Sequence, residues 1–163
     1  MFPSGNVVFG SSDTGSAAAL RAQLDGRVLD AKFALDELAR VDTSDTFFSG
    51  RLDLEKIGAF GWSFGGATAA ELARVDSRCK ASAAMHGRFW KTNLLNQPLV
   101  TPFLLFRADG PDPDPTDSII GIPYDDRKAI YDKLTTDAYW VKLTLQQQTT
   151  RRPHLSLHRL ANF

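Results

Sequence analysis

Apolar and polar residues follow two different patterns along the chain, and each pattern predicts a kind of secondary structure. Over residues 27–41, apolar side chains recur at helical spacing and charged side chains fall mostly on the other side, which predicts an amphipathic helix. Four short runs rich in apolar residues instead predict strands. These runs are 56–60, 81–85, 101–107 and 138–145.

The order of these segments predicts the fold class. Residues 67–75 are helix-forming and follow the first predicted strand, and residues 125–134 have a helical pattern and precede the last one. Strands that alternate with helices indicate an α/β fold with a mostly parallel sheet flanked by helices. Residues 7–9 form a further short apolar run, either an edge strand or an extended segment. The tail from residue 146 is polar.

Length and composition indicate one folded domain over residues 1–163. Of the 163 residues, 43% are hydrophobic, which is enough for one hydrophobic core and too few for two cores of ordinary size. The 19 basic residues balance the 19 acidic ones, so the zero net charge disfavours strong steering toward nucleic acid or an anionic membrane. No run reaches the ~20 apolar residues that span a bilayer.

Cysteine, histidine and the first residues of the chain restrict compartment and cofactor. The single cysteine, Cys79, cannot form an internal disulfide, so no secreted disulfide framework is expected. Three histidines and one cysteine do not support a zinc site, and we predict no metal. The start of the chain carries no signal-peptide pattern, which makes cytoplasmic the default localisation.

One motif carries recognisable chemistry, the G-x-S-x-G sequence from Gly61 to Gly65. It lies between a predicted strand and a predicted helix. In this setting a sharp turn strains the serine backbone and lifts the Ser63 hydroxyl above the sheet, at the positive end of the helix. The two glycines are small because larger residues would collide with the adjacent strand and helix. We predict that Ser63 is a nucleophile and that the Phe64 N–H donates to an oxyanion; a structural Gly/Ser turn is the alternative.

A nucleophilic serine needs a histidine as base and an acid that orients the histidine. Hydrolases with this motif have the chain order serine, acid, histidine, which favours a histidine beyond the last predicted strand. His154 is nearer to that strand than His158, and we predict His154 as the base. The alternative is that both are solvated loop residues.

The predicted acid is Asp109, which follows the strand predicted over 101–107. Asp112 and Asp114 lie in the same proline-rich loop. Alternating Asp and Pro also forms rigid solvated turns, which is the competing interpretation. A calcium loop is disfavoured because no glutamate stands at the required spacing.

Two segments resemble a known family. They are RVLDAKFALDEL at residues 27–38 and LDLEKIGAFGWSFGGATA at residues 52–69. Together they resemble the platelet-activating-factor acetylhydrolase-like branch of the α/β-hydrolases, which includes lipases, esterases and, among relatives, polyester hydrolases. The resemblance implies a serine esterase that acts on a small-molecule ester without a cofactor, and it supports Ser63 and Phe64 in their predicted roles.

Two residues depart from the family pattern. Trp62 stands where the family usually has His, although some related polyester hydrolases have Trp there, and the resemblance implies that Trp62 lines the substrate cleft. His86 stands where the family carries the triad aspartate before a glycine. Either Asp109 replaces that acid or the triad is defective. His86 is expected near Ser63, where it is a candidate local partner.

The family domain is also longer than this chain. The resemblance implies that the first strands, with the loop that holds the second oxyanion donor, are missing. A shortened sheet exposes an apolar edge and face, so a homodimer is one expected outcome. The alternative function is a weakly active or non-catalytic hydrolase-fold protein that acts as a binding or assembly module.

Overall fold

The computed structural model describes residues 16–87, 89, 92–108, 118–119, 122–123, 127–144 and 154–159. The helices are α1 (Ala17–Ser44), α2 (Phe64–Val75), α3 (Arg127–Tyr131) and the short 3₁₀ helix η1 (Asn93–Leu95). The main sheet contains β1 (Ile57–Trp62), β2 (Cys79–Met85), β3 (Phe103–Ala108), β6 (Ala138–Thr144) and β7 (His154–Arg159). A small hairpin joins β4 (Ser118–Ile119) to β5 (Ile122–Pro123).

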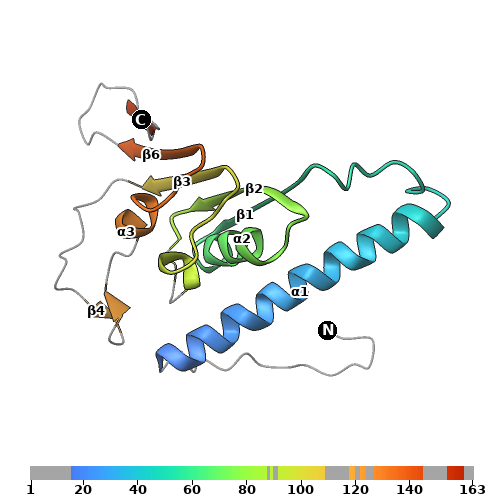
Figure 1. Cartoon of the computed structure of the whole chain (residues 1–163), viewed down its shortest axis with the longest axis horizontal. Helices are drawn as coiled ribbons and strands as arrows, with labels where there is room; N and C mark the ends of the chain where they lie inside the picture. The colour runs from blue at the N-terminus through green and yellow to red at the C-terminus, as the bar shows by residue number, and fades with distance from the viewer. Residues whose placement is uncertain are drawn as a thin grey trace, which may run out of the picture.

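The main sheet confirms the predicted fold class. Its strand order is β1-β2-β3-β6-β7, and the first four strands are parallel (Figure 1). Strand β7 runs antiparallel to β6. The four parallel strands are the four predicted from the apolar runs, with ends that differ by at most two residues. Strand β7 was not predicted, because the tail of the chain is polar.

Helix α1 is much longer than predicted. It covers 28 residues instead of the segment 27–41. The Ser16 side chain caps its first turn by accepting a hydrogen bond from the Ala19 N–H at 3.1 Å. Its last turn is followed by Asp45, whose side chain accepts hydrogen bonds from the N–H groups of Phe47 and Phe48. The apolar run at 7–9, expected to be an edge strand or an extended segment, lies outside the described residues.

Helix α2 packs between the sheet and α1 (Figure 1). Small side chains allow this close packing: Ala67 and Ala70 are fully buried, and α2 contacts both β1 and β2. On one side of α2, Leu24 and Val28 of α1 pack against Leu72. On the other side, α2, η1 and α3 cover one face of the sheet and enclose a larger core.

The opposite face of the sheet is apolar; it is exposed at β1 and more buried toward β6, where Val141 is 3% exposed. Its residues form two rows across the strands, set by the strand register. The rows are Trp62, Met85, Phe106 and Val141, and Phe60, Ala83, Leu104 and Tyr139. In β1 these side chains are exposed, 77% for Phe60 and 64% for Trp62. Within the described segments, no helix has the length and hydrophobicity to cross a membrane.

Candidate active site

Ser63 occupies a sharp turn between β1 and α2. Its φ of 51° and ψ of −119° lie in a region that non-glycine residues rarely adopt, at a cost of roughly 1–3 kcal/mol. The Ser63 N–H donates to the Met85 carbonyl at 2.9 Å and so still belongs to the sheet, while the Ser63 carbonyl accepts from the Gly66 N–H at 2.9 Å and starts the helix. The strand–turn–helix order and the strained serine backbone are those predicted from the sequence.

The glycines of the motif differ in their steric roles. A Cβ atom at Gly61 would lie 2.2 Å from the carbonyl carbon and oxygen of Gly65, so this position admits only glycine without rearrangement. A Cβ atom at Gly65 would meet nothing within 4 Å. The predicted collision at Gly65 is therefore wrong. The tight position on the helix is Gly66, where a Cβ atom would lie 3.1 Å from the Ala84 Cβ.

A second turn, after β2, packs directly beneath the first. His86 also has a positive φ, 53°, and its N–H donates to the Phe106 carbonyl at 2.8 Å. A Cβ atom at Gly87 would lie 2.9 Å from the Ser63 carbonyl oxygen, so the two turns fit only because Gly87 has no side chain. This role of Gly87 was not predicted from the sequence. The one sign of it was that Gly87 closely follows the second predicted strand.

Trp62 and His86 stack beside the Ser63 turn. Their ring centroids are 5.5 Å apart and the rings are inclined by 19°. Trp62, Ser63 and His86 are all exposed. Among the described residues, neither the Ser63 hydroxyl nor the His86 ring makes a hydrogen bond, so both are accessible to a ligand. The structure therefore confirms the expected proximity of His86 to the Ser63 turn.

Phe64 is the first residue of α2, where the helix dipole concentrates positive charge. Its ring lies under the Arg27 guanidinium of α1, 4.9 Å from the ring centroid. This cation–π contact fixes the side of α2 that adjoins α1. The start of α2 is thus held by β2 through the Ser63 N–H and by α1 through Phe64.

The other two predicted site residues are His154 and Asp109, and the structure describes only the backbone of His154. His154 is the first residue of β7, paired with Thr144 at the carboxyl end of β6. It therefore lies at the same edge of the sheet as Ser63. Four strand spacings separate its backbone from β1, roughly 19 Å. Its side chain and the whole of Asp109 lie outside the description. The described geometry brings Trp62 and His86, and not the His154 backbone, next to Ser63.

Three ionisable groups with a shifted pKa lie away from this turn, at the opposite ends of α2 and β2. A hydrogen bond from the Arg78 side chain lowers the pKa of Asp76 from 3.8 to about 2. The same contact, together with Asp36, raises the pKa of Arg78. Burial raises the pKa of the Cys79 thiol. These groups stabilise the junction between α2 and β2 and take no part in the site.

Fold and site together define an α/β protein with a strained serine turn between a parallel strand and a helix. No family model matches the sequence, and no curated protein matches it. Among solved structures the chain is similar to a ferulic acid esterase from Streptomyces cinnamoneus, with 27% identity and a TM-score of 0.61. The match covers 86% of this chain and 38% of that chain. The chain thus spans well under half the length of the esterase it resembles.

Proposed function

We propose that this protein is a serine carboxylic-ester hydrolase with Ser63 as its nucleophile. The observation that carries the proposal is the strained, exposed Ser63 between a parallel strand and a helix, in a chain similar to an esterase. This is the arrangement of a nucleophile elbow, in which a backbone turn presents a serine hydroxyl to a substrate. The resemblance of the sequence to acetylhydrolase-like enzymes supports the same chemistry.

The reaction proceeds by acyl transfer. The Ser63 Oγ attacks the ester carbonyl carbon while a histidine takes its proton, and the negative charge that develops on the carbonyl oxygen is stabilised by the Phe64 N–H at the start of α2. The histidine then gives the proton to the departing alcohol as the carbon–oxygen bond breaks. Water attacks the acyl-serine with help from the same histidine, which releases the acid and restores Ser63.

Two histidines are candidates for the base. His154 is the one predicted by chain order, with Asp109 as the orienting acid. His86 is favoured by a specific observation, its ring stacked on Trp62 beside the Ser63 turn. Trp62 offers an exposed aromatic surface for the acyl group. We therefore extend the proposal to esters of aromatic acids, because the similar esterase is named for ferulic acid.

The test is hydrolysis of p-nitrophenyl acetate and methyl ferulate by the purified protein and matched variants. Ser63→Ala should lower kcat by about 10³-fold or more, because no other group replaces the nucleophile. Ser49→Ala, at another exposed serine, should leave the rate unchanged. Equal rates in the Ser63→Ala variant and the unmodified protein would overturn the proposal.

The same assay assigns the base. Alanine at the base should cost about as much as alanine at Ser63, because the two act as one unit. His154→Ala and His86→Ala are compared, with His158→Ala as the control. A large loss only at His154 supports the predicted triad, and a large loss only at His86 supports the local pair.

A non-catalytic binding or assembly module is the second candidate function. It is favoured by the exposed Phe60 and Trp62 and by the small share of the similar esterase that this chain covers. The two functions are separated by the Ser63→Ala comparison. Ester hydrolysis that disappears with the hydroxyl excludes a purely non-catalytic role.

A further inference from the structure

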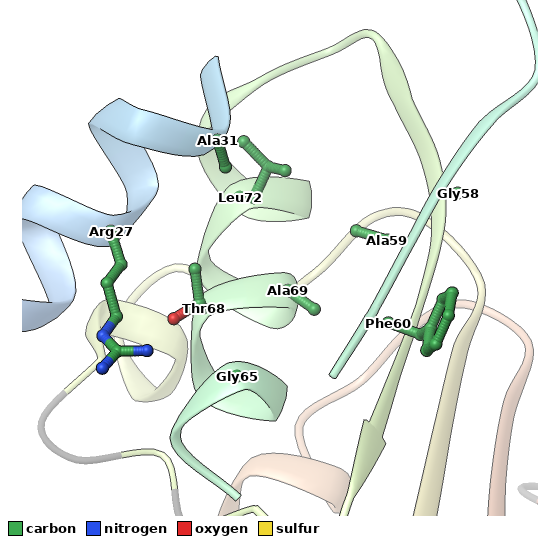
Figure 2. Close-up of a pocket in the computed structure, with 9 residues that line it drawn as sticks. All are labelled: Arg27, Ala31, Gly58, Ala59, Phe60, Gly65, Thr68, Ala69 and Leu72. Atoms are coloured by element: carbon green, nitrogen blue, oxygen red, sulfur yellow. The ribbon is translucent and has the colours of Figure 1, made fainter. Parts of the chain in front are cut away.

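Trp62 ends β1 on the face of the sheet that points away from α2. Figure 2 shows Ala59 pointing from β1 toward α2 and Phe60 on the other side of the strand; side chains alternate along a strand, so Trp62 lies on the side of Phe60. Trp62 also immediately precedes Ser63, so its ring lies beside the turn that presents the serine hydroxyl. How the indole ring is held therefore affects which acyl groups fit at this turn.

The neighbour that holds the indole ring of Trp62 is His86. The two ring centroids are 5.5 Å apart and the rings are inclined by 19°, which is a stacked arrangement. Within the described part of the chain, this stack is the one ring contact of Trp62, and the indole N–H has no hydrogen-bond partner there. Met85 is the register partner of Trp62, but its unbranched side chain is flexible and fixes a neighbouring ring less firmly than a second ring does.

The backbone at His86 leaves the extended conformation where this stack forms. Trp62 and Met85 are register partners, so regular alternation would place the next side chain, His86, on the face toward α2. Instead His86 has a φ of 53°, in the left-handed region, which costs free energy in a residue other than glycine. The hydrogen bond from the His86 N–H to the Phe106 carbonyl, at 2.8 Å, holds the turn in place. Backbone strain that surrounding contacts maintain is typical of functional positions.

We propose that His86 is a positioning residue that holds the Trp62 ring as the binding surface for an aromatic acyl group at Ser63. This inference rests on the proposed function and deepens it, because it gives His86 a role in substrate selection that requires no proton transfer. The stacked orientation supports this role, since among the described residues the His86 ring makes no hydrogen bond to the Ser63 hydroxyl. A flat feruloyl group gains contact with a ring that is already fixed in place, whereas an acetyl group gains little from it.

The test is the ratio of kcat/KM for p-nitrophenyl ferulate to kcat/KM for p-nitrophenyl acetate. The two esters share their leaving group, so a loss at the nucleophile, the base or the oxyanion donor lowers both values and leaves the ratio unchanged. Trp62→Ala should lower the ratio roughly 10-fold, and His86→Asn, which suits the left-handed backbone but has no ring, should lower it roughly 3-fold. His86→Phe keeps a flat ring but cannot take a proton, and it should keep the ratio within about 2-fold of the unmodified chain.

Two comparisons separate positioning from general damage to the protein. In a Trp62→Ala background, His86→Asn should no longer lower the ratio, because the ring that His86 positions is gone. Phe48→Asn removes one ring of another exposed aromatic pair, Phe47 and Phe48, whose centroids are 5.0 Å apart in the loop before β1, and it should leave the ratio unchanged. Thermal unfolding confirms that each variant is folded.

Binding of ferulate, the acid that hydrolysis of a feruloyl ester releases, gives a readout that needs no turnover. Titration calorimetry should show that the Kd for ferulate rises in Trp62→Ala and in His86→Asn and changes little in His86→Phe. If hydrolysis does not depend on Ser63, the proposed function fails, and these Kd values alone decide the role of His86. The proposal is overturned by a ratio or a Kd that His86→Asn leaves unchanged, by a His86→Phe variant that behaves like His86→Asn, or by an unmodified chain that does not bind ferulate.

Discussion

The two glycines of the G-x-S-x-G motif provide a stringent test of the turn, because the same substitution should have opposite effects at the two positions. Gly61→Ala places a Cβ atom 2.2 Å from backbone atoms of Gly65 and 2.8 Å from the Gly66 nitrogen. Those neighbours are backbone, so the turn itself must move. Gly65→Ala places its Cβ atom in open space within the first turn of α2.

The expected magnitudes follow from these contacts. Overpacking costs about 1–3 kcal/mol, and a clash with backbone belongs at the upper end, so we expect Gly61→Ala to lower the free energy of unfolding by about 3 kcal/mol. Alanine is favoured over glycine in a helix, so Gly65→Ala should raise that free energy by up to about 1 kcal/mol. The two variants should therefore differ by about 4 kcal/mol.

Urea unfolding followed by circular dichroism measures both changes on the same scale. Because the m-value should not change, the midpoints alone report the difference. Gly66→Ala should be intermediate, since its Cβ atom would lie 3.1 Å from the Ala84 methyl group. Equal midpoints for Gly61→Ala and Gly65→Ala, or a larger loss at Gly65, would refute the described geometry of the turn.

Three further predictions concern the packing around α2. Glu71 is 1% exposed and pairs with Arg74 at 2.7 Å and with Arg21 at 3.2 Å, so Arg74→Ala removes one of two partners and should lower the free energy of unfolding by about 2 kcal/mol in urea titration. Arg40→Ala, at an exposed pair, should cost less than about 1 kcal/mol. Asp76→Asn should lower the free energy of unfolding by about 2 kcal/mol near neutral pH, because the pKa of Asp76 is lowered from 3.8 to about 2. This difference in free energy between the variant and the unmodified chain is complete above pH 3.8 and should disappear as the pH falls through about 2. Cys79 is fully buried and its thiol pKa is raised, so it should react with iodoacetamide only on unfolding, and rapid alkylation of the native protein, followed by mass spectrometry, would contradict this packing.

The parallel sheet was predictable because its strands are short apolar runs between helical segments. The extent of α1 was not, because Gly26 and polar residues interrupt the periodicity over its first turns, and the Ser16 cap and the packing of Leu20 and Leu24 sustain the helix there. Strand β7 escaped prediction for a similar reason. Its strand conformation depends on pairing with β6, and its own polar sequence does not indicate a strand.

The candidate site was predicted where local sequence determines geometry. The Ser63 turn depends on adjacent residues, and His86 lies beside it because neighbouring parallel strands end at the same edge of the sheet. The role of Gly65 was mispredicted, because its Cβ position is open and the tight contact on the helix falls at Gly66 instead. A distant base cannot be located from sequence alone, since its position depends on how the chain crosses four strands. His154 and Asp109 therefore remain predictions.

The most direct test of the central claim is covalent labelling of the native protein with a fluorophosphonate, with the modified residue located by mass spectrometry. We expect one label, on Ser63, that is lost in Ser63→Ala and after unfolding, because only the folded turn activates this hydroxyl. An unlabelled native protein, or a label that persists unchanged in Ser63→Ala, would contradict it.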